Sequence, residues 1–202
     1  MAEPLPLAFY RRDPVVVAQE LLNKVLVRGQ RQGRIVETEA YGGSSDPASH
    51  AFRGLTPRNA TMFGPAGHLY VYFTYGMHHC ANVVCEEDGI AGAVLLRGLT
   101  PLAGLADMYA ARPGARRDVD LCNGPAKICQ SFALGRSLDG DNLGGLGEVT
   151  IFDDTTPPPE PPGVSARIGV SAGAQRPWRF YVPGALGVSG AQRSRVHDHT
   201  TQ

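Results

Sequence analysis

Two acids and a tyrosine alternate along a short stretch of the chain, where residues 34–41 read Arg-Ile-Val-Glu-Thr-Glu-Ala-Tyr. If this stretch is a β-strand, Glu37, Glu39 and Tyr41 project from one face, because successive side chains of a strand point to opposite faces. A carboxylate beside an aromatic ring suits a site that stacks a planar ligand and activates a water molecule. The solvated outer face of a sheet would carry the same pattern, so this stretch alone leaves both interpretations open.

A second stretch, residues 69–77, is rich in aromatic residues and reads Leu-Tyr-Val-Tyr-Phe-Thr-Tyr-Gly-Met. On a strand, Tyr70 and Tyr72 share a face, whereas Tyr75 lies beside a glycine at an expected turn, with Met77 after it. Tyrosines within a strand can be ordinary packing residues. A tyrosine at a hairpin tip lies in water, however, and an exposed aromatic wedge suits insertion between nucleic-acid bases.

A single charged residue, Arg97, ends the apolar run of residues 93–96. A buried guanidinium must be hydrogen-bonded or paired with an acid to be tolerated. An ion pair with Glu37 or Glu39 would satisfy it, and so would a contact to a ligand. Both roles stay open at this level.

His78, His79, Cys80 and Cys85 could be drawn as a zinc cluster. They lie on a predicted strand, however, so alternate members point to opposite faces. The four cysteines of the chain also lack the Cys-x-x-Cys spacing of a metal or redox site. We therefore expect buried thiols, no metal ion and no cofactor.

These side chains need strands and helices to position them. Asp13 before Pro14 predicts a capped helix start, and residues 42–68 show little periodicity, which predicts a long loop of the kind that often carries function. The expected elements are helices over 13–22, 100–111 and 125–134, and strands over 24–28, 34–41, 69–75, 78–84, 91–99, 167–171 and 178–182.

The mixture of strands and helices without regular alternation predicts one α+β domain over residues 1–202, with its core at about 8–183. After Pro183 the sequence is small and polar, and we expect a flexible tail over 184–202.

The composition is that of a globular protein, with 43% hydrophobic and 19% charged residues. The net charge is zero, from 19 basic and 19 acidic residues, which excludes a uniformly basic protein that coats nucleic acid but not one with a basic face. The apolar runs are too short for a membrane span. Residues 1–12 lack the cationic start and apolar stretch of a secretory signal, so we expect an intracellular protein, nucleoid-associated in a bacterium.

Taken together, the motifs resemble those of the alkyladenine (3-methyladenine) DNA glycosylase family of the mammalian type. The resemblance runs in order from about residue 8 to residue 183, and the ordered set is specific although each motif alone is weak. It rests on residues 34–41, His50, 56–59 (Thr-Pro-Arg-Asn), 62–63, 69–72, 75–77, Asn82, 94–97, 121–125 (Leu-Cys-Asn-Gly-Pro), Lys127 and 179–182.

The resemblance implies a fold and an activity. The fold is a curved antiparallel sheet flanked by helices, with a protruding hairpin that inserts into DNA. The activity is base-excision repair, in which an alkylated or deaminated purine is flipped out of duplex DNA and its N-glycosidic bond is hydrolysed. The damaged bases handled in the family include 3-methyladenine, 7-methylguanine, hypoxanthine and ethenoadenine. Lys24 and Lys127 lie outside the catalytic motifs, so we expect a monofunctional enzyme without lyase activity.

Matched by position, Glu39 resembles the general base that deprotonates the attacking water, and Arg97 resembles the residue that holds this water with it. The resemblance makes Tyr41 and Tyr72 the walls of the base pocket, with His50 at its edge.

The same match assigns Asn82 to the rejection of the 2-amino group of normal guanine, Tyr75 to the wedge in the duplex, and Met77 to the position beside it. The candidate contacts to DNA phosphates are basic residues that could equally be solvated surface: Arg53, Arg58, Arg116, Arg117, Lys127 and Arg179. The expected partner is double-stranded DNA with damaged purines, bound by a monomer that needs neither a membrane nor a metal.

Three alternatives stay open at the level of sequence. A catalytically silent protein could capture damaged bases without excision, although capture alone needs no water activator such as Glu39. A metal-dependent hydrolase could use the histidines and cysteines of residues 78–85, and an RNA-binding module could use the tyrosine-rich hairpin.

Overall fold

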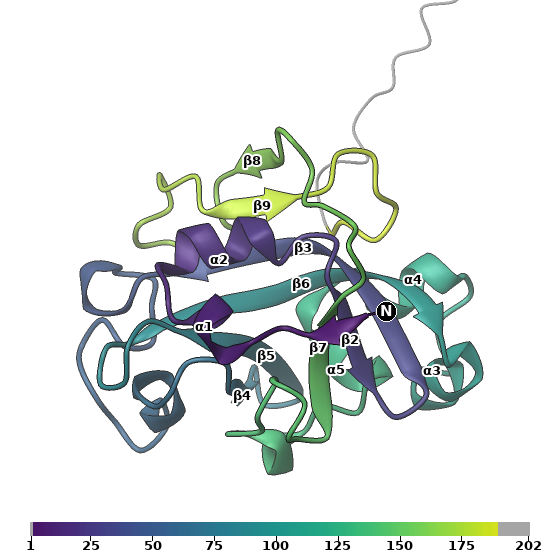
Figure 1. Cartoon of the computed structure of the whole chain (residues 1–202), viewed down its shortest axis with the longest axis horizontal. Coiled ribbons are helices and arrows are strands. Elements are labelled where there is room, and N and C mark those ends of the chain that lie inside the picture. The colour runs from purple at the N-terminus through teal and green to yellow at the C-terminus, as the bar shows by residue number, and fades with distance from the viewer. Residues whose placement is uncertain (1, 190–202) are drawn as a thin grey trace, which may run out of the picture.

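One antiparallel sheet organises the molecule, of which the structure, a computed structural model, describes residues 2–189. The strands lie in the order β1-β7-β2-β3-β6-β5-β4, with β9 beside β3 and β8 beside β9. The sheet is curved, as Figure 1 shows. The strands are β1 (Glu3–Pro4), β2 (Val25–Arg28), β3 (Arg31–Tyr41), β4 (Leu69–Thr74), β5 (His78–Cys85), β6 (Gly92–Ala103), β7 (Val149–Asp153), β8 (Gly163–Ser165) and β9 (Arg179–Tyr181).

Short helices lie against the sheet and do not alternate with its strands (Figure 1). Among them, α2 packs on β3, and α5 packs on β5 and β6. The helices are α1 (Leu7–Tyr10), α2 (Pro14–Glu20), α3 (Leu105–Ala111), α4 (Asp118–Cys122) and α5 (Pro125–Ser131), with 3-10 turns η1 (Gly43–Ser45), η2 (Ala60–Phe63) and η3 (Arg136–Leu138). The prediction of an α+β fold around a curved antiparallel sheet is confirmed, as are the helices expected near 13–22 and 125–134 and the strands expected near 24–28, 34–41, 69–75 and 78–84.

The start of α2 follows directly from the sequence. The carboxylate of Asp13 accepts a hydrogen bond from the amide of Val15 at 2.7 Å, and Pro14 occupies the first turn, where its missing amide donor costs nothing. The carbonyl of Ala18 accepts a hydrogen bond from the Thr38 hydroxyl at 2.8 Å. The helix is thereby tied to the middle of β3, the strand that carries both acids.

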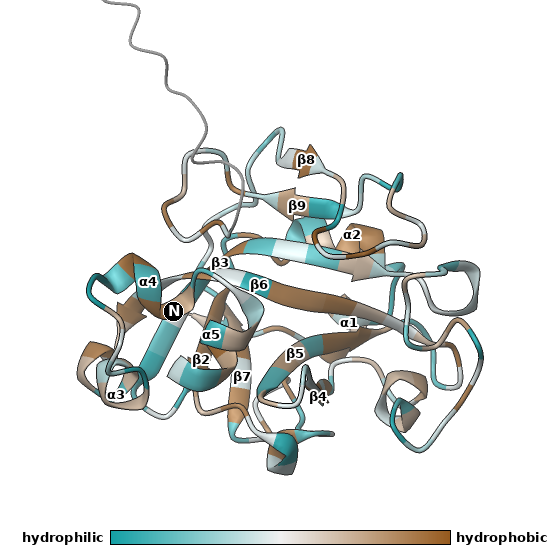
Figure 2. Ribbon diagram, turned by 180° about the vertical axis from the view of Figure 1, so that it is seen from behind, coloured by the Kyte–Doolittle hydropathy of each residue, from teal (hydrophilic) through white to brown (hydrophobic). Residues whose placement is uncertain are grey.

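The hydrophobic core lies between the helices and the central strands, and Figure 2 shows hydrophobic residues concentrated along β5 and β6. Its fully buried side chains include Leu96, Leu99 and Phe132. Burial of one such side chain contributes roughly 1.5–3 kcal/mol. Because the four cysteines are free, apolar packing and not a disulfide holds the strands of the site in place.

The helix expected over residues 100–111 is wrong in its first part. β6 runs on to Ala103 and pairs with the start of β3, and α3 begins only after Gly104. Gly104 has a φ of 73°, and a side chain there would meet the backbone of Gln30. Pairing with a long neighbouring strand therefore keeps residues 100–103 extended, with Pro101 next to a register shift.

The strand expected over residues 167–171 is also wrong, because β8 lies earlier and residues 167–171 form irregular structure. The side chain of Arg167 is completely buried in an ion pair with Asp46. This long-range contact holds the segment in place, and no local pattern in the sequence signals it.

The segment after Pro183, expected to be a flexible tail, begins with packed residues. Ser189 is 5% exposed, and its amide donates to the Glu37 carboxylate at 2.5 Å. Residues 184–189 thus belong to the folded part of the chain, and the rest of the expected tail lies outside the described residues.

Candidate active site

The strand register places the chemistry-bearing residues on one face of the sheet. Tyr70 of β4 lies opposite Asn82 of β5, Asn82 lies opposite Leu95 of β6, and Leu95 lies opposite Glu39 of β3. Residues directly opposite each other in antiparallel strands project to the same face, so four strands contribute to one row. Alternate positions extend this face to Tyr41, Tyr72, Thr74, Cys80 and Ala93.

Arg97 reaches this face at a break in the register. Glu37 pairs with Gly98 and Thr38 pairs with Leu96, so Arg97 has no opposite residue on β3. Such a β-bulge bends the strand and re-aims a side chain, and bulges are common next to active sites. The guanidinium contacts both acids of β3 as a result.

Glu37 is saturated with hydrogen bonds. Its Oε1 accepts from Nε of Arg179 at 2.6 Å, from Nε of Arg97 at 3.1 Å and from the Ser189 hydroxyl at 2.9 Å. Its Oε2 accepts from the Ser189 amide. With two guanidinium partners and no place on a cavity wall, this acid serves as an internal anchor.

Glu39 is equally buried but less neutralised. Its Oε1 accepts a hydrogen bond from the Ile168 amide at 2.7 Å and lies 3.4 Å from Nη1 of Arg97. Its Oε2 accepts from the Tyr41 hydroxyl at 2.9 Å. Burial raises the pKa of Glu39 above the usual value for a glutamate, and the Arg97 charge and the two hydrogen bonds offset this only in part. A carboxylate with a raised pKa is a better proton acceptor near neutral pH.

The interpretation of these acids as a solvated outer face is wrong, since neither Glu37 nor Glu39 has any exposed surface. The ion pair expected for Arg97 is confirmed, and it involves both acids. The same guanidinium also lines a cavity, so the two roles left open for Arg97 are compatible.

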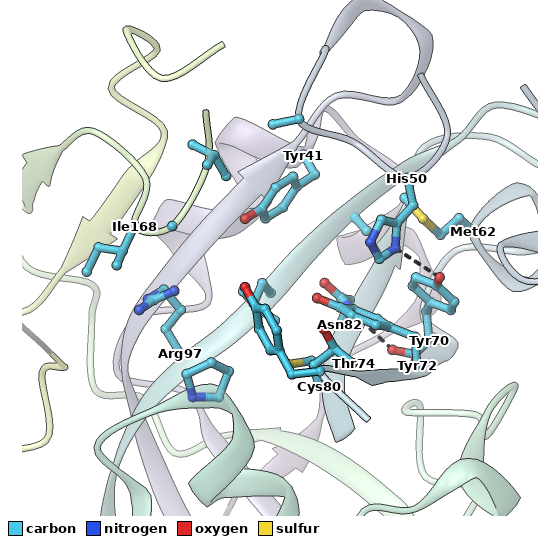
Figure 3. A pocket seen from close by; sticks show the side chains of 17 residues that line it. Tyr41, His50, Met62, Tyr70, Tyr72, Thr74, Cys80, Asn82, Arg97 and Ile168 are labelled. Atoms are coloured by element: carbon cyan, nitrogen blue, oxygen red, sulfur yellow. Dashed lines mark hydrogen bonds between the residues drawn. The ribbon is translucent and has the colours of Figure 1, made fainter. Parts of the chain in front are cut away.

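A cavity of about 250 Å³ adjoins these residues, and Figure 3 shows side chains from several elements pointing into it. Tyr41, Arg97 and Ile168 line the cavity and also contact the Glu39 carboxylate, which lies behind them. The other lining residues are Ala48, His50, Met62, Tyr70, Tyr72, Thr74, Tyr75, Cys80, Asn82, Ala93, Leu95, Pro125, Gly169 and Val170. Aromatic walls with a few polar groups are typical of a pocket for a small planar ligand.

His50 and Asn82 supply polar atoms at the edge of the cavity (Figure 3). Nδ1 of His50 lies 3.1 Å from the Tyr70 hydroxyl, and the imidazole meets the Tyr72 ring edge to face at 4.5 Å. Burial lowers the pKa of His50, and the charge of Arg58 adds to the effect. The imidazole is therefore neutral near pH 7, and within residues 2–189 its Nε2 has no hydrogen-bond partner. Asn82 donates from Nδ2 to the Tyr70 carbonyl at 3.2 Å.

The hairpin between β4 and β5 presents large apolar side chains to solvent. Tyr75 is 84% exposed and Met77 is 68% exposed. Tyr75 has a φ of 50° and Gly76 a φ of 68°, so two successive residues adopt the left-handed conformation of a tight turn. This conformation is uncommon for a residue with a side chain. Tyr75 also lines the cavity.

Four of the basic residues expected to contact phosphates are exposed: Arg53, Arg58, Arg116 and Arg117. Arg58 lies at the hairpin, where its Nη2 donates to the Phe73 carbonyl at 3.2 Å and its guanidinium lies 5.7 Å from the centre of the Tyr72 ring. A cation in this position flanks the cavity.

Three of the expected phosphate contacts bind side chains within the chain: Arg117, Lys127 and Arg179. Arg117 is paired with Asp120, and Lys127 donates to the side chain of Asn123 at 2.6 Å. Arg179 is 4% exposed, and all three nitrogens of its guanidinium are hydrogen-bonded inside the protein. Arg179 therefore has an internal role in place of the expected phosphate contact.

Two residues that contribute to the site were not predicted from the sequence. Ile168 contributes its backbone amide, which every residue except proline possesses, so its side chain gives no signal. Ser189 follows Pro183 in a polar segment and reaches Glu37 only through folding.

Within residues 2–189, no group of three or more histidine, cysteine, aspartate or glutamate side chains is placed to hold a metal ion. In the stretch considered for zinc, Cys80 and Cys85 are buried, and the His79 ring packs against Phe73. In the same part of the chain, no helix has both the length and the apolar character needed to cross a membrane.

The fold and the site together define an aromatic-walled cavity with a buried acid behind its wall. Comparison with known proteins agrees, since the sequence model described as "Methylpurine-DNA glycosylase (MPG)" matches residues 8–186. A protein of Burkholderia lata is 54% identical over 188 residues, 92% of this chain and 91% of the relative. Relatives from Streptomyces avermitilis (45% over 186 residues, 89% and 87% of the chains) and Chlorobaculum tepidum (43% over 190 residues, 91% and 90%) are similar.

All three relatives are provisionally named 3-methyladenine DNA glycosylase. The chain belongs to the methylpurine-DNA glycosylase family and is a DNA glycosylase, with DNA as its substrate. The resemblance seen in the sequence is confirmed.

Proposed function

We propose that this glycosylase flips a damaged purine out of duplex DNA into the cavity and hydrolyses its N-glycosidic bond with a water molecule activated by Glu39. The observation that carries the proposal is the position of Glu39, whose carboxylate contacts three residues of the cavity wall, Tyr41, Arg97 and Ile168. The proposed substrates are 3-methyladenine, 7-methylguanine, hypoxanthine and ethenoadenine.

In the proposed reaction, water attacks C1′ of the flipped nucleotide while the bond between C1′ and the purine nitrogen breaks. Glu39 accepts a proton from the water, and the purine leaves with the electron pair of the broken bond. A carboxylate has about four acceptor positions, so one acceptor position of Glu39 remains for a water besides its three contacts. Arg97 would hold this water and favour the ionised form of Glu39.

General base catalysis supplies about 10²–10⁴-fold in rate, which is less than an enzyme needs for a slow hydrolysis. The buried charge of Glu39 can supply more, because an anion in a water-poor site stabilises positive charge that develops on the sugar. Cationic methylated purines are good leaving groups. Neutral hypoxanthine would depend more on groups that lower the negative charge that develops on it as it leaves.

Base selection would depend on the balance between flipping and stacking. Extruding a base costs a few kcal/mol and costs least for a damaged base, whereas stacking on an aromatic ring returns about 1–3 kcal/mol. Tyr41 and Tyr72 are the proposed walls. The free Nε2 of His50 is proposed to bond the edge of the base, and Asn82 to exclude the 2-amino group of guanine.

Tyr75 is the proposed wedge that fills the duplex after the base has left, with Met77 beside it. The high exposure of both side chains supports this role. Arg53, Arg58 and Arg116 are the proposed phosphate contacts. Arg117 and Lys127 would first have to release the side chains of Asp120 and Asn123 before contacting a phosphate.

The enzyme is proposed to be monofunctional. A lyase step needs an amine that attacks C1′ to form a Schiff base. Lys24 is bound to Asp153 at 2.8 Å, and Lys127 is bound to Asn123. Neither lysine lines the cavity.

The test is the release of hypoxanthine and of 3-methyladenine from duplex DNA in the presence of EDTA, comparing the wild type with Glu39→Gln. Wild-type release that drops by about 10²–10⁴-fold in the variant supports the assignment. The matched control is Glu87→Gln, which changes an exposed acid and should keep full activity. If the wild type binds lesion DNA tightly but releases no base, the capture protein is the better description.

A further inference from the structure

A second buried ion pair lies behind the wall of the cavity. The side chains of Arg167 and Asp46 are both completely buried, and the two terminal nitrogens of the guanidinium donate to the two carboxylate oxygens at 2.5 and 2.8 Å. Asp46 also accepts from the amides of Gly42 and Ala48, both at 3.2 Å. Burial alone would raise the pKa of Asp46, but the hydrogen bonds and charge of Arg167 outweigh it and hold the pKa below the usual value. The pair therefore stays ionised at neutral pH.

Arg167 connects three parts of the site. Its Nη1 donates to the Ala40 carbonyl at 2.9 Å, which joins it to the end of β3. Its guanidinium carbon lies 4.7 Å from the centre of the Tyr41 ring and 5.3 Å from that of Trp178. Tyr41 lines the cavity and Arg167 does not. The guanidinium thus supports the aromatic wall without reaching the space where a base would lie.

The peptide that follows Arg167 carries the amide of Ile168, which donates to Glu39 at 2.7 Å. Fixing the guanidinium of Arg167 therefore restrains the peptide group that contacts Glu39, the proposed general base. Stability alone explains this pair poorly, because buried ion pairs contribute little compared with well-packed apolar residues of the same volume. Their use in fixing one specific arrangement explains it better.

We propose that Arg167 and Asp46 are positioning residues, which hold the Ile168 amide on Glu39 and the Tyr41 ring against the flipped base. The proposal rests on the proposed function of Glu39. Neither residue touches the base or the water. Their effect is transmitted through one peptide group and one aromatic ring.

The experiment measures single-turnover excision of hypoxanthine at saturating enzyme, as a function of pH, for the wild type and Arg167→Lys. Lysine keeps the charge but cannot donate to both oxygens of Asp46 in parallel. Displacing a reacting group by about 1 Å costs up to about 100-fold, so we expect a rate 10- to 100-fold lower with a much smaller change in lesion affinity. Because the Ile168 amide lowers the pKa of Glu39, its displacement should also move the acidic limb of the pH–rate profile to higher pH.

The matched control is Arg176→Lys. Arg176 stacks on the same Trp178 ring at 4.4 Å and donates to the Ser45 carbonyl at 2.7 Å, without contact to Glu39 or Asp46. It should keep both the rate and the pH profile. Asp46→Asn, which keeps the shape of the acid, is the second variant if Arg167→Lys does not fold.

Including Glu39→Gln separates the two proposals. If that variant excises as fast as the wild type, the proposed function of Glu39 fails. If Glu39→Gln is inactive, the proposed function of Glu39 stands and the other two variants test the positioning role. That role is overturned if folded Arg167→Lys and Asp46→Asn keep the wild-type rate. It is also overturned if they lose rate while the acidic limb of the pH–rate profile does not move.

Discussion

The two acids of β3 form two differently built regions around one shared arginine. The interior cluster consists of Glu37, Arg179 and Ser189, and the cavity cluster consists of Glu39, Tyr41 and Ile168. Arg97 contacts both, at 3.1 Å from Glu37 and at 3.4 Å from Glu39. Both acids are completely buried, so burial alone does not distinguish a structural acid from a chemical one.

The number of positive groups around each acid distinguishes them. Glu37 has two guanidinium partners and two further hydrogen bonds from Ser189. Glu39 has one guanidinium at 3.4 Å and two neutral donors, and burial raises its pKa. A carboxylate held by several internal donors suits an anchor. An incompletely neutralised carboxylate beside a cavity can accept a proton, and this is the asymmetry from which the function is inferred.

The largest expected effect is on stability, from Glu37→Gln. This change leaves two buried guanidinium groups without their common anion, and breaking a buried pair costs about 3–5 kcal/mol. Urea unfolding measures the loss. Glu39→Gln should cost much less, because it removes a carboxylate that burial already disfavours. Equal losses in the two variants would contradict the distinction between the clusters.

Tyr75→Ala should weaken function without weakening the fold. Loss of one stacking ring costs about 1–3 kcal/mol of affinity for lesion DNA, whereas a side chain that is 84% exposed contributes little to folding. Binding titration and thermal unfolding measure the two quantities. The matched control is Ile90→Ala, which removes another exposed apolar side chain that does not line the cavity. A large fall in melting temperature for Tyr75→Ala would mean that this side chain stabilises the fold, as the interior cluster does.

The sequence predicts the face but not the contacts of these clusters. The period of two along β3 is enough to place Glu39 and Tyr41 together, since the register confirms one shared face. The bulge that aims Arg97 is invisible because it arises from the pairing of two distant strands. The burial of Arg179 is equally hidden.

Segments far apart in the sequence complete both regions. Ile168 and Ser189 meet β3 only in the folded chain, 129 and 152 residues from their carboxylate partners. Local patterns cannot report such contacts, so residues 167–171 do not form the expected strand, and Ser189, which the expected tail after Pro183 included, is packed in the structure.

A smaller effect, on pH dependence, should follow from Tyr41→Phe. The Tyr41 hydroxyl bond lowers the pKa of Glu39, so its loss raises that pKa further. In the proposed reaction excision needs the ionised acid, so its rate should fall as the pH drops through the pKa. The acidic limb of the single-turnover profile should therefore move to higher pH. Tyr72→Phe is the matched control, since it keeps an aromatic wall and the Tyr72 hydroxyl is not bonded to Glu39; a shift of equal size there would contradict the role of the Tyr41 hydroxyl.

The smallest expected effect separates surface arginines from interior ones. Each phosphate contact adds about 0.9 to the slope of log affinity against log salt concentration, so Arg58→Ala should lower the slope by about this amount and leave stability unchanged. Arg179→Ala should do the reverse, because Arg179 binds Glu37 and Ser189 inside the protein. Binding to lesion DNA over a range of salt concentrations, with urea unfolding of both variants, measures the contrast. A lower slope for Arg179→Ala at unchanged stability would mean that this guanidinium leaves the interior cluster to reach DNA. Glu37 would then not be an anchor held by Arg179, and the distinction between the two acids of β3 would fail.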